Sequence, residues 1–198
     1  RDAIRALESE VRSRFVRFCI LRAKTVFASS RSARRAFALE RKQLTAAEMP
    51  LLCREIMEEP HISSLMTLSL GGNLLDAGAV ATLMRLVVCT PESSNLSELD
   101  LGQNVHMGTE GVRAIAAAIA HRHWTVRKLW VNDCDLEVDA GFILARALRT
   151  TRILSVLDLR NNKLNDAAVV SLHECSRVAS RTDGKIITIV VDGNPISG

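Results

Sequence analysis

Five segments of the chain repeat one spacing of apolar residues. Apolar side chains stand at the first, fourth and sixth positions and Asn or Cys at the ninth, and four of the five segments have an apolar residue at the eleventh. The segments begin at Leu65, Leu96, Val126, Leu154 and Ile186, so successive starts are 28 to 32 residues apart. Chance rarely places Asn or Cys correctly five times in a row, and a period of this length is typical of a repeat architecture.

The spacing within each segment predicts a short β-strand followed by a turn. Side chains of a strand alternate between its two faces, so the fourth and sixth positions point into the core and the residues between them point out. We expect the asparagine to bind backbone groups where the chain leaves the strand, because these groups would otherwise be buried without partners. In the third segment Cys134 takes this position, where we expect a small buried residue rather than a reactive thiol.

Helical patterns fill the intervals between the predicted strands. They span 76–88, 109–120, 137–148 and 166–178, and a further helix over 44–56 belongs to an incomplete repeat ahead of the first strand. Strand and helix alternating at this period predict an α/β fold over 44–198. The expected architecture is a horseshoe-shaped solenoid with a parallel sheet on its concave side and helices on its convex side.

Residues 1–43 differ from this body, and we expect a basic, amphipathic helical arm. They carry 12 Lys/Arg and 4 Asp/Glu, a net charge of +8, whereas the rest of the chain carries −4. A helix is predicted over 2–28, followed by a break at 28–32. Its apolar stripe consists of Ile4, Leu7, Val11, Phe15, Phe18 and Leu21. The basic residues singled out in the arm are Arg5, Arg12, Arg22, Arg34 and Arg35.

Three roles are open for this arm. The stripe can dock on the first repeat and shield its leucines, as the ends of solenoids require. Alternatively, the helix can bind a partner protein, or its basic face can bind a membrane surface or nucleic acid. Nucleic acid is the least favoured, because the basic residues are interleaved with apolar ones and no known nucleic-acid-binding motif is present.

The repeat itself resembles a known family. Leu-Asp-Leu at 99–101 and 157–159, with Asn-x-Leu at 162–164, is similar to the ribonuclease-inhibitor type of leucine-rich repeat over residues 44–198. Asn104-Val105-His106 departs from Asn-x-Leu, so we expect a local irregularity there. That subfamily includes ribonuclease inhibitor, the Ran GTPase-activating protein, tropomodulin, NOD-like receptors and axonemal subunits. The resemblance therefore implies a scaffold without choosing among functions.

The outward positions of the strands predict the side chains on the concave surface. The candidates for binding a protein are Glu98, Asp100, Lys128, Trp130, Asn132, Asp133, Asp158, Arg160 and Asp192. Trp130 stands at the centre of this row among polar residues, a composition typical of interaction hot spots. The alternative is that Trp130 packs along neighbouring side chains of the sheet. Trp124, at a turn between helix and strand, is expected in the core.

The sequence lacks the motifs of common catalytic sites, so we expect no enzyme, no cofactor, no metal site and no small-molecule substrate. Its glycines form neither a phosphate loop nor a dinucleotide-binding motif. The five cysteines are all more than 30 residues apart, which indicates reduced thiols and a cytoplasmic location, cytoskeletal or ciliary structures included. Arg85 interrupts the best candidate for a membrane span, 79–89, so none is expected.

Together these patterns predict a non-enzymatic scaffold or adaptor that binds protein through its concave strands and its N-terminal helix. We expect a subunit of a larger intracellular assembly, such as an axonemal or cytoskeletal complex. The alternatives are a GTPase regulator resembling the Ran GTPase-activating protein and a signalling or sensing module of the NOD-like-receptor type.

Overall fold

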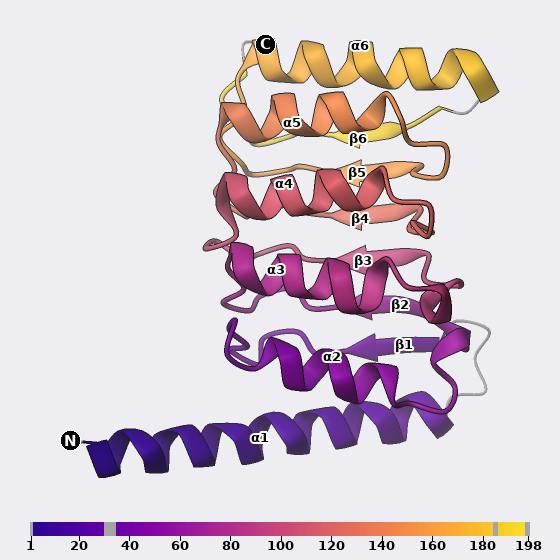
Figure 1. Ribbon diagram of the computed structural model, residues 1–198. Helices are drawn as coiled ribbons and strands as arrows, with labels where there is room; N and C mark the ends of the chain where they lie inside the picture. Colours follow the sequence, from indigo (N-terminus) through magenta and orange to yellow (C-terminus); the bar gives the residue numbers. More distant parts are fainter. Residues whose placement is uncertain (1, 30–34, 184–185, 197–198) are drawn as a thin grey trace.

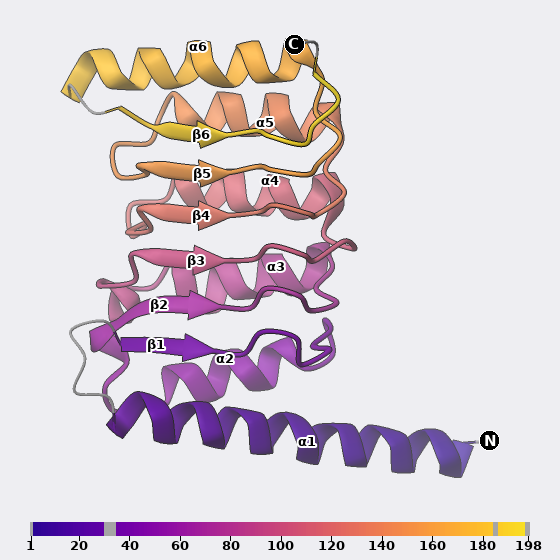
Figure 2. The ribbon, with the colours of Figure 1, turned by 180° about the vertical axis from the view of Figure 1, so that it is seen from behind.

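The chain forms a single parallel sheet with helices stacked on one of its faces (Figures 1 and 2). The computed structural model describes residues 2–29, 35–183 and 186–196, with side chains at 10–25, 35–178 and 186–196. The six strands, in spatial and sequence order, are β1 (Arg35–Ala38), β2 (Leu65–Ser69), β3 (Glu98–Asp100), β4 (Lys128–Trp130), β5 (Val156–Asp158) and β6 (Thr188–Val190). The predicted α/β solenoid is confirmed.

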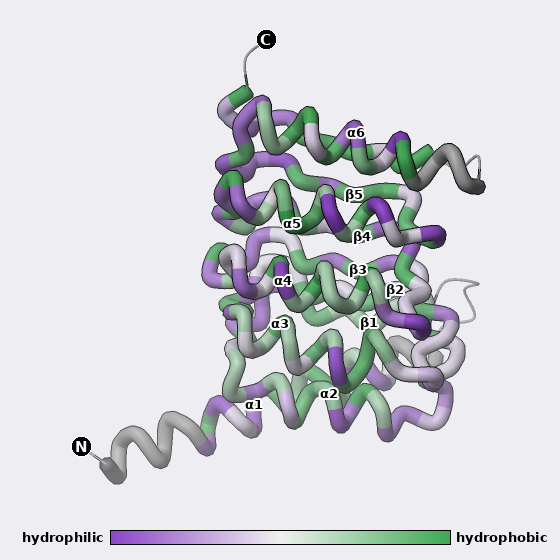
Figure 3. Tube along the Cα trace, turned by 45° about the horizontal axis from the view of Figure 1, so that its top comes forward, coloured by the Kyte–Doolittle hydropathy of each residue, from purple (hydrophilic) through white to green (hydrophobic). Residues whose placement is uncertain are grey.

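The helices connect consecutive strands and form a second layer. They are α2 (Met49–Met57), α3 (Ala77–Leu83), α4 (Gly108–Ile119), α5 (Val138–Leu148) and α6 (Asp166–Asp183). The predicted helix over 76–88 is α3 continued by a π-helical turn, Met84–Val88. Hydrophobic residues recur between hydrophilic ones along these helices (Figure 3). At helical spacing they form one apolar side, which packs against the sheet.

The strands pair in a register that stacks equivalent side chains. Phe37 pairs with Leu68, and the same row continues through Leu99, Leu129 and Leu157 to Ile189. The first five members of the row are buried. Each repeat therefore buries its apolar positions against the next one, and no repeat has a core of its own.

Buried asparagines connect four of the repeats to the preceding one, and Cys134 stands in their place in the repeat that begins at Val126. Asn104 donates its amide hydrogens to the carbonyl oxygens of Leu101, in its own repeat, and Leu70, in the preceding one. Its Oδ1 accepts a hydrogen bond from the backbone N–H of Leu75, also in the preceding repeat. Asn73, Asn162 and Asn194 make equivalent bonds. The predicted role of the asparagine is confirmed.

The irregular second repeat is completed by a residue one position further along. His106, at the eleventh position, is exposed, and Met107 is buried instead. Met107 also contacts the position where a Cβ of Gly111 would lie, so the start of α4 has room for its side chain only because residue 111 is glycine. A thioether fills an irregular gap easily, since its side chain is unbranched and flexible.

The boundary predicted between arm and solenoid at residue 43 is wrong. Residues 35–38 are the strand β1, and beyond it the N–H groups of Leu39 and Arg41 donate to the carbonyl oxygens of Ser69 and Gly71. The physical reason is that Phe37 fills the same core row as Leu68. The first repeat therefore begins before the end of the predicted arm.

Helix α1 (Asp2–Ser29) covers the β1 end of the stack, against β1 and α2 (Figure 1). This agrees with docking on the first repeat, but the docking face is not the predicted stripe. Val16, Cys19, Ile20 and Ala23 are buried. Val11, Phe15, Phe18 and Leu21 of the predicted stripe are 49 to 61% exposed. The helix thus has two apolar stripes, and the one with smaller side chains packs on the sheet.

Candidate protein-binding surface

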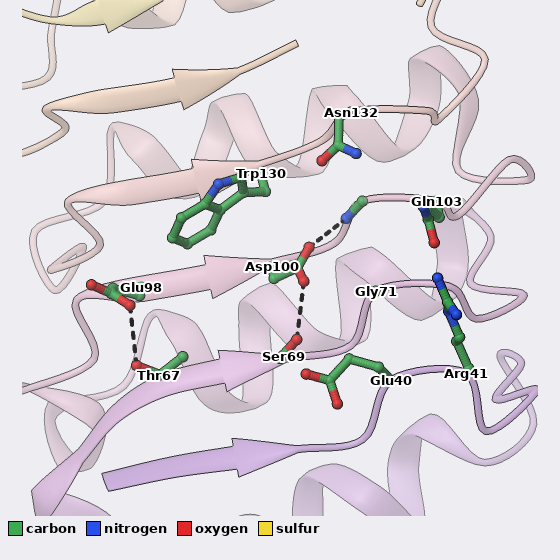
Figure 4. A pocket seen from close by; sticks show the side chains of 11 residues that line it. Glu40, Arg41, Thr67, Ser69, Gly71, Glu98, Asp100, Gln103, Trp130 and Asn132 are labelled. Carbon is green, nitrogen blue, oxygen red and sulfur yellow. Dashed lines mark hydrogen bonds between the residues drawn. The ribbon is translucent and has the colours of Figure 1, made fainter. Parts of the chain in front are cut away.

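An open hollow of about 640 Å³ lies on the concave face over β1 to β4 (Figure 4). It exists because outward side chains of the strands and their following turns surround a floor of small residues. The hollow is lined by Glu40, Arg41, Thr67, Ser69, Gly71, Glu98, Asp100, Gly102, Gln103, Trp130 and Asn132.

Two glycines make room for polar side chains that line the hollow. A Cβ added at Gly71 would lie 2.9 Å from Oδ2 of Asp100, and one added at Gly102 would lie 2.5 Å from Oδ1 of Asn132. A larger residue at either position would displace a polar side chain of the lining.

Trp130 is the largest side chain of the hollow. It is half-buried and pairs in register with Asp100 on β3. Figure 4 shows its indole between β4 and the carboxylates of Glu98 and Asp100. An indole in this setting offers an aromatic face to an apolar or cationic group, and the nearby carboxylates favour a cation.

The carboxylates beside Trp130 are held in place by the strands. Asp100 accepts hydrogen bonds from the Ser69 hydroxyl at 3.0 Å and from the N–H of Gly102 at 2.9 Å. Glu98 accepts one from the hydroxyl of Thr67 at 3.3 Å, and its other oxygen lies 2.9 Å from the ammonium of Lys128. With Glu40, three acids and one arginine line the hollow, so its charge is negative.

The structure brings together four of the nine predicted residues in this hollow, namely Glu98, Asp100, Trp130 and Asn132. Lys128 lies beside them through its ion pair with Glu98. Asp133, Asp158, Arg160 and Asp192 lie outside the lining, toward β6.

Asp158 is not the exposed acid that the alternation predicts. Its side chain is 4% exposed and binds the guanidinium of Arg160, with an Nη2–Oδ2 distance of 2.6 Å. The hydrogen bond to the Asp158 carboxylate, together with the negative charge of that carboxylate, raises the pKa of Arg160. The two residues lie two apart on the same face, so they pair with each other and Asp158 is withdrawn from solvent. Arg160 remains half-exposed.

Two lining residues, Glu40 and Arg41, were missed because they were assigned to the arm. A signal for them existed. Phe37, Leu39 and Leu44 stand 31 residues ahead of their counterparts in the next repeat, Leu68, Leu70 and Leu75. This repeat lacks the first apolar residue and the asparagine of the pattern. For this reason the spacing of five positions did not detect it.

The three predicted basic residues of the arm whose side chains the structure describes, Arg12, Arg22 and Arg35, have different surroundings. Arg12 lies 2.6 Å from the carboxylate of Glu48, and Arg35 donates to the hydroxyl of Ser64. Arg22 is exposed on α1. The side chain of Arg5 and all of Arg34 lie outside the described residues. Arg12 and Arg35 therefore contribute to the fold, and Arg22 is available to a ligand.

Trp124 and Cys134 are core residues, as expected. Trp124 is 2% exposed. Burial raises the pKa of the Cys134 thiol to about 12, and its sulfur lies 3.3 Å from the carbonyl oxygens of Leu101 and Asn132.

Neither a metal centre nor a membrane span is found in the part of the chain that the structure describes. There, no three or more His, Cys, Asp or Glu side chains come together as metal ligands. No described helix combines the length and apolar character needed to cross a membrane.

Comparison with known proteins agrees with this architecture. The Leucine Rich repeat family matches residues 92–116. Ribonuclease inhibitor of Mus musculus is 34% identical over 91 residues, 46% of this chain and 20% of the relative. NACHT, LRR and PYD domains-containing protein 12 of Mus musculus is 32% identical over 132 residues, 65% of this chain and 11% of the relative. NACHT, LRR and PYD domains-containing protein 3 of Homo sapiens is 32% identical over 77 residues, 39% of this chain and 7% of the relative.

The chain thus spans a fifth or less of each of these relatives. What it shares with them is the repeat, seen in both the sequence matches and the stacked strand–helix units. In sequence and in architecture, the chain is similar to leucine-rich-repeat proteins of the ribonuclease-inhibitor-like type.

Proposed function

We propose that the chain is a non-enzymatic protein-binding module that holds a partner on its concave face. The observation that carries this proposal is the half-buried Trp130 beside carboxylates in an open hollow of about 640 Å³. Tryptophan is enriched among the residues that contribute most to protein–protein binding, especially where polar groups surround it.

The charge of the hollow favours a partner with a basic patch. Glu40 is exposed and makes no hydrogen bond or ion pair with the described residues, and Glu98 and Asp100 flank the indole. An arginine or lysine of a partner can stack on Trp130 while its charge is compensated by these carboxylates. Complementary charge of this kind increases the rate of association and selects the partner.

The cellular setting is a further part of the proposal. We place the chain in the cytoplasm, as a subunit of a larger assembly such as a cytoskeletal or axonemal complex. Support comes from the five cysteines, which are free in the structure, and from the concave face and α1, two separate surfaces with which one chain can join two partners. A recognition segment of a signalling protein is the second candidate, favoured by the similarity to NACHT, LRR and PYD domains-containing proteins.

Site-specific crosslinking tests the concave face directly. A photoreactive residue at Thr67, in the hollow, is compared with one at Phe142, which is exposed on the convex helix α5. We expect a partner to be captured from position 67 only, and Trp130→Ala to weaken its binding by about 2 kcal/mol, roughly thirtyfold. Capture from position 142 alone, or an unchanged affinity of Trp130→Ala, would remove the concave face as the binding surface.

A further inference from the structure

A second surface lies on α1, away from the face that packs on the sheet. Val11, Phe15, Phe18 and Leu21 are 49 to 61% exposed and follow one another at intervals of three or four residues. They form one stripe about 15 Å long on the helix. We call these four residues the outer stripe. Large apolar side chains gathered on one helical face are typical of an interaction site.

The outer stripe borders a groove between α1 and β1. The groove has a volume of about 350 Å³ and is lined by Phe15, Phe18, Cys19, Arg22, Ala23, Ala36, Ala38 and Lys42. Ala36 and Ala38 are in register with Thr67 and Ser69, so the floor of the groove is the concave surface of the sheet. The small alanine side chains leave space there that Phe15 and Phe18 border from the helix.

The helix that carries the outer stripe is fixed to the body of the protein. Its opposite face is buried through Val16, Cys19, Ile20 and Ala23. Two ion pairs tie α1 to the α2 region, Arg12 with Glu48 at 2.6 Å and Lys24 with Glu55 at 3.0 Å. The outer stripe is therefore presented in a set orientation and needs no ordering when a ligand binds.

The charge around the groove is positive. Among the described residues of its lining, Arg22 and Lys42 are basic and none is acidic, and Arg17 is exposed on the same helix. None of these three makes an ion pair within the described residues. A ligand that buries the outer stripe must therefore bring negative charge to the flank of the stripe.

We propose that the outer stripe and the groove bind an acidic amphipathic helix of another protein. Apolar residues of that helix, three and four apart, would pack between Phe15 and Phe18 and over the alanines of β1. Its Glu or Asp residues would pair with Arg22 and Lys42. This is the helix-in-groove mode of recognition, in which the spacing of the apolar residues selects the ligand.

The same observations disfavour two other occupants. A second copy of the chain would place the same basic residues opposite one another, which costs binding energy. A membrane surface is flat on the scale of one helix, and it cannot enter a groove whose floor is Ala36 and Ala38. Charge and shape thus both favour an acidic protein helix.

A synthetic helical peptide provides the probe. It carries leucines at three- and four-residue spacing and glutamates on the flanks, and a matched peptide has lysine at each glutamate position. Binding to the full chain is measured by fluorescence anisotropy. We expect saturable binding of the acidic peptide alone, weakened by salt because the charges are exposed.

Single substitutions locate the binding site. Phe18→Ser and Arg22→Glu are each expected to weaken binding of the acidic peptide at least about tenfold. Phe142→Ser, on the exposed convex face, is the matched control and should leave the affinity unchanged. Trp130→Ala should also leave it unchanged, so this site can fail or hold independently of the concave one. Unfolding midpoints close to that of the parent show that Phe18→Ser is folded.

Several outcomes overturn the proposal. These are the absence of saturable binding, equal binding of the lysine peptide, and equal weakening by Phe142→Ser. Binding to vesicles of anionic lipid that depends on Phe18 and excludes the acidic peptide assigns the stripe to a membrane. A dimer in analytical ultracentrifugation that is lost in Phe18→Ser assigns the stripe to a second copy.

Discussion

The guanidinium of Arg12 on α1 lies 2.6 Å from the carboxylate of Glu48, immediately ahead of α2. A second nitrogen of Arg12 donates to the carbonyl oxygen of Gln43. Glu48 in turn accepts a hydrogen bond from the backbone N–H of Thr45. One arginine thus connects the capping helix to the turn of the first repeat.

Arg12→Gln is expected to lower the free energy of unfolding by about 1 kcal/mol. The Glu48 side chain is 9% exposed, so the substitution leaves a nearly buried carboxylate without its cation, whereas the half-exposed arginine limits the effect. Urea denaturation at low and high salt checks it, and the difference should shrink with salt. Arg14→Gln, which removes an ion pair with both partners exposed, serves as control and should have no measurable effect. Equal effects of the two substitutions would contradict this account.

The two apolar stripes of α1 should differ sharply in their contribution to stability. Ile20→Ala is expected to cost about 3 kcal/mol, because Ile20 is 1% exposed and its removal leaves a cavity under the helix. Phe18→Ala, two positions away, should change the free energy of unfolding by less than about 0.5 kcal/mol, because its side chain is largely in solvent. Chemical denaturation of both variants provides the comparison. A larger loss for Phe18 would mean that α1 packs through the other face.

Met107 and Gly111 should show a strong energetic coupling. Gly111→Ala is expected to destabilise the protein by about 1–3 kcal/mol, because the new Cβ overlaps the side chain of Met107. Met107→Ala is expected to cost about 2–4 kcal/mol through the cavity that it leaves. In the double variant the alanine at 111 no longer meets the thioether. The double variant should therefore lose clearly less stability than the two single variants lose in sum. Strict additivity in a double-mutant cycle would show that the two side chains do not compete for space.

Thiol reactivity should separate the cysteines by burial. Burial raises the pKa of Cys53 to about 12, an effect that Arg85 partly offsets, and burial likewise raises that of Cys134 to about 12. A thiol reagent at pH 8 should modify Cys175 in the native protein, because this residue is only half-buried. Cys53 and Cys134 are buried and should react only when the protein unfolds. Mass spectrometry of the labelled peptides measures the order.

The same shift fixes the sign of the alkaline pH dependence. A thiol whose pKa is raised by folding stabilises the native state below the unfolded value of about 9, and this contribution is lost as pH rises toward 12. Each thiol contributes at most about 1.4 kcal/mol per pH unit within that interval. Cys134→Ala should therefore show a shallower decline of stability between pH 9 and 11 than the parent protein, and an identical decline would contradict the assignment.

Much of the fold could be predicted from the repeat because its period fixes both strand positions and core residues. The spacing of Leu96, Leu99 and Leu101 placed β3 and its buried side chains correctly. Cys134 could be assigned to the core because it stands at the position of the asparagines, which is buried in all five segments that match the pattern. The prediction failed for the first repeat, in which only Phe37, Leu39 and Leu44 keep the spacing.

The candidate site was only partly predictable for a related reason. Alternation along a strand gives the direction of Asp100, Trp130 and Asp158, but not which of them a neighbouring side chain covers. Arg160 withdraws Asp158 from solvent, and this depends on a side-chain conformation that no pattern encodes. Helix α1 poses the same difficulty, because its periodicity predicted one stripe of large apolar side chains, whereas the helix packs on the first repeat through Val16, Cys19, Ile20 and Ala23.

The buried asparagines couple neighbouring repeats in both directions. The amide oxygen of Asn104 satisfies the N–H of Leu75 in the preceding repeat, and that of Asn162 satisfies the N–H groups of Cys134 and Leu136. The amide hydrogens of the same asparagines need the carbonyl oxygens of Leu70 and Val131 in the preceding repeats. Opening either repeat of such a pair therefore breaks hydrogen bonds of the other, so neighbouring repeats should unfold together rather than one at a time.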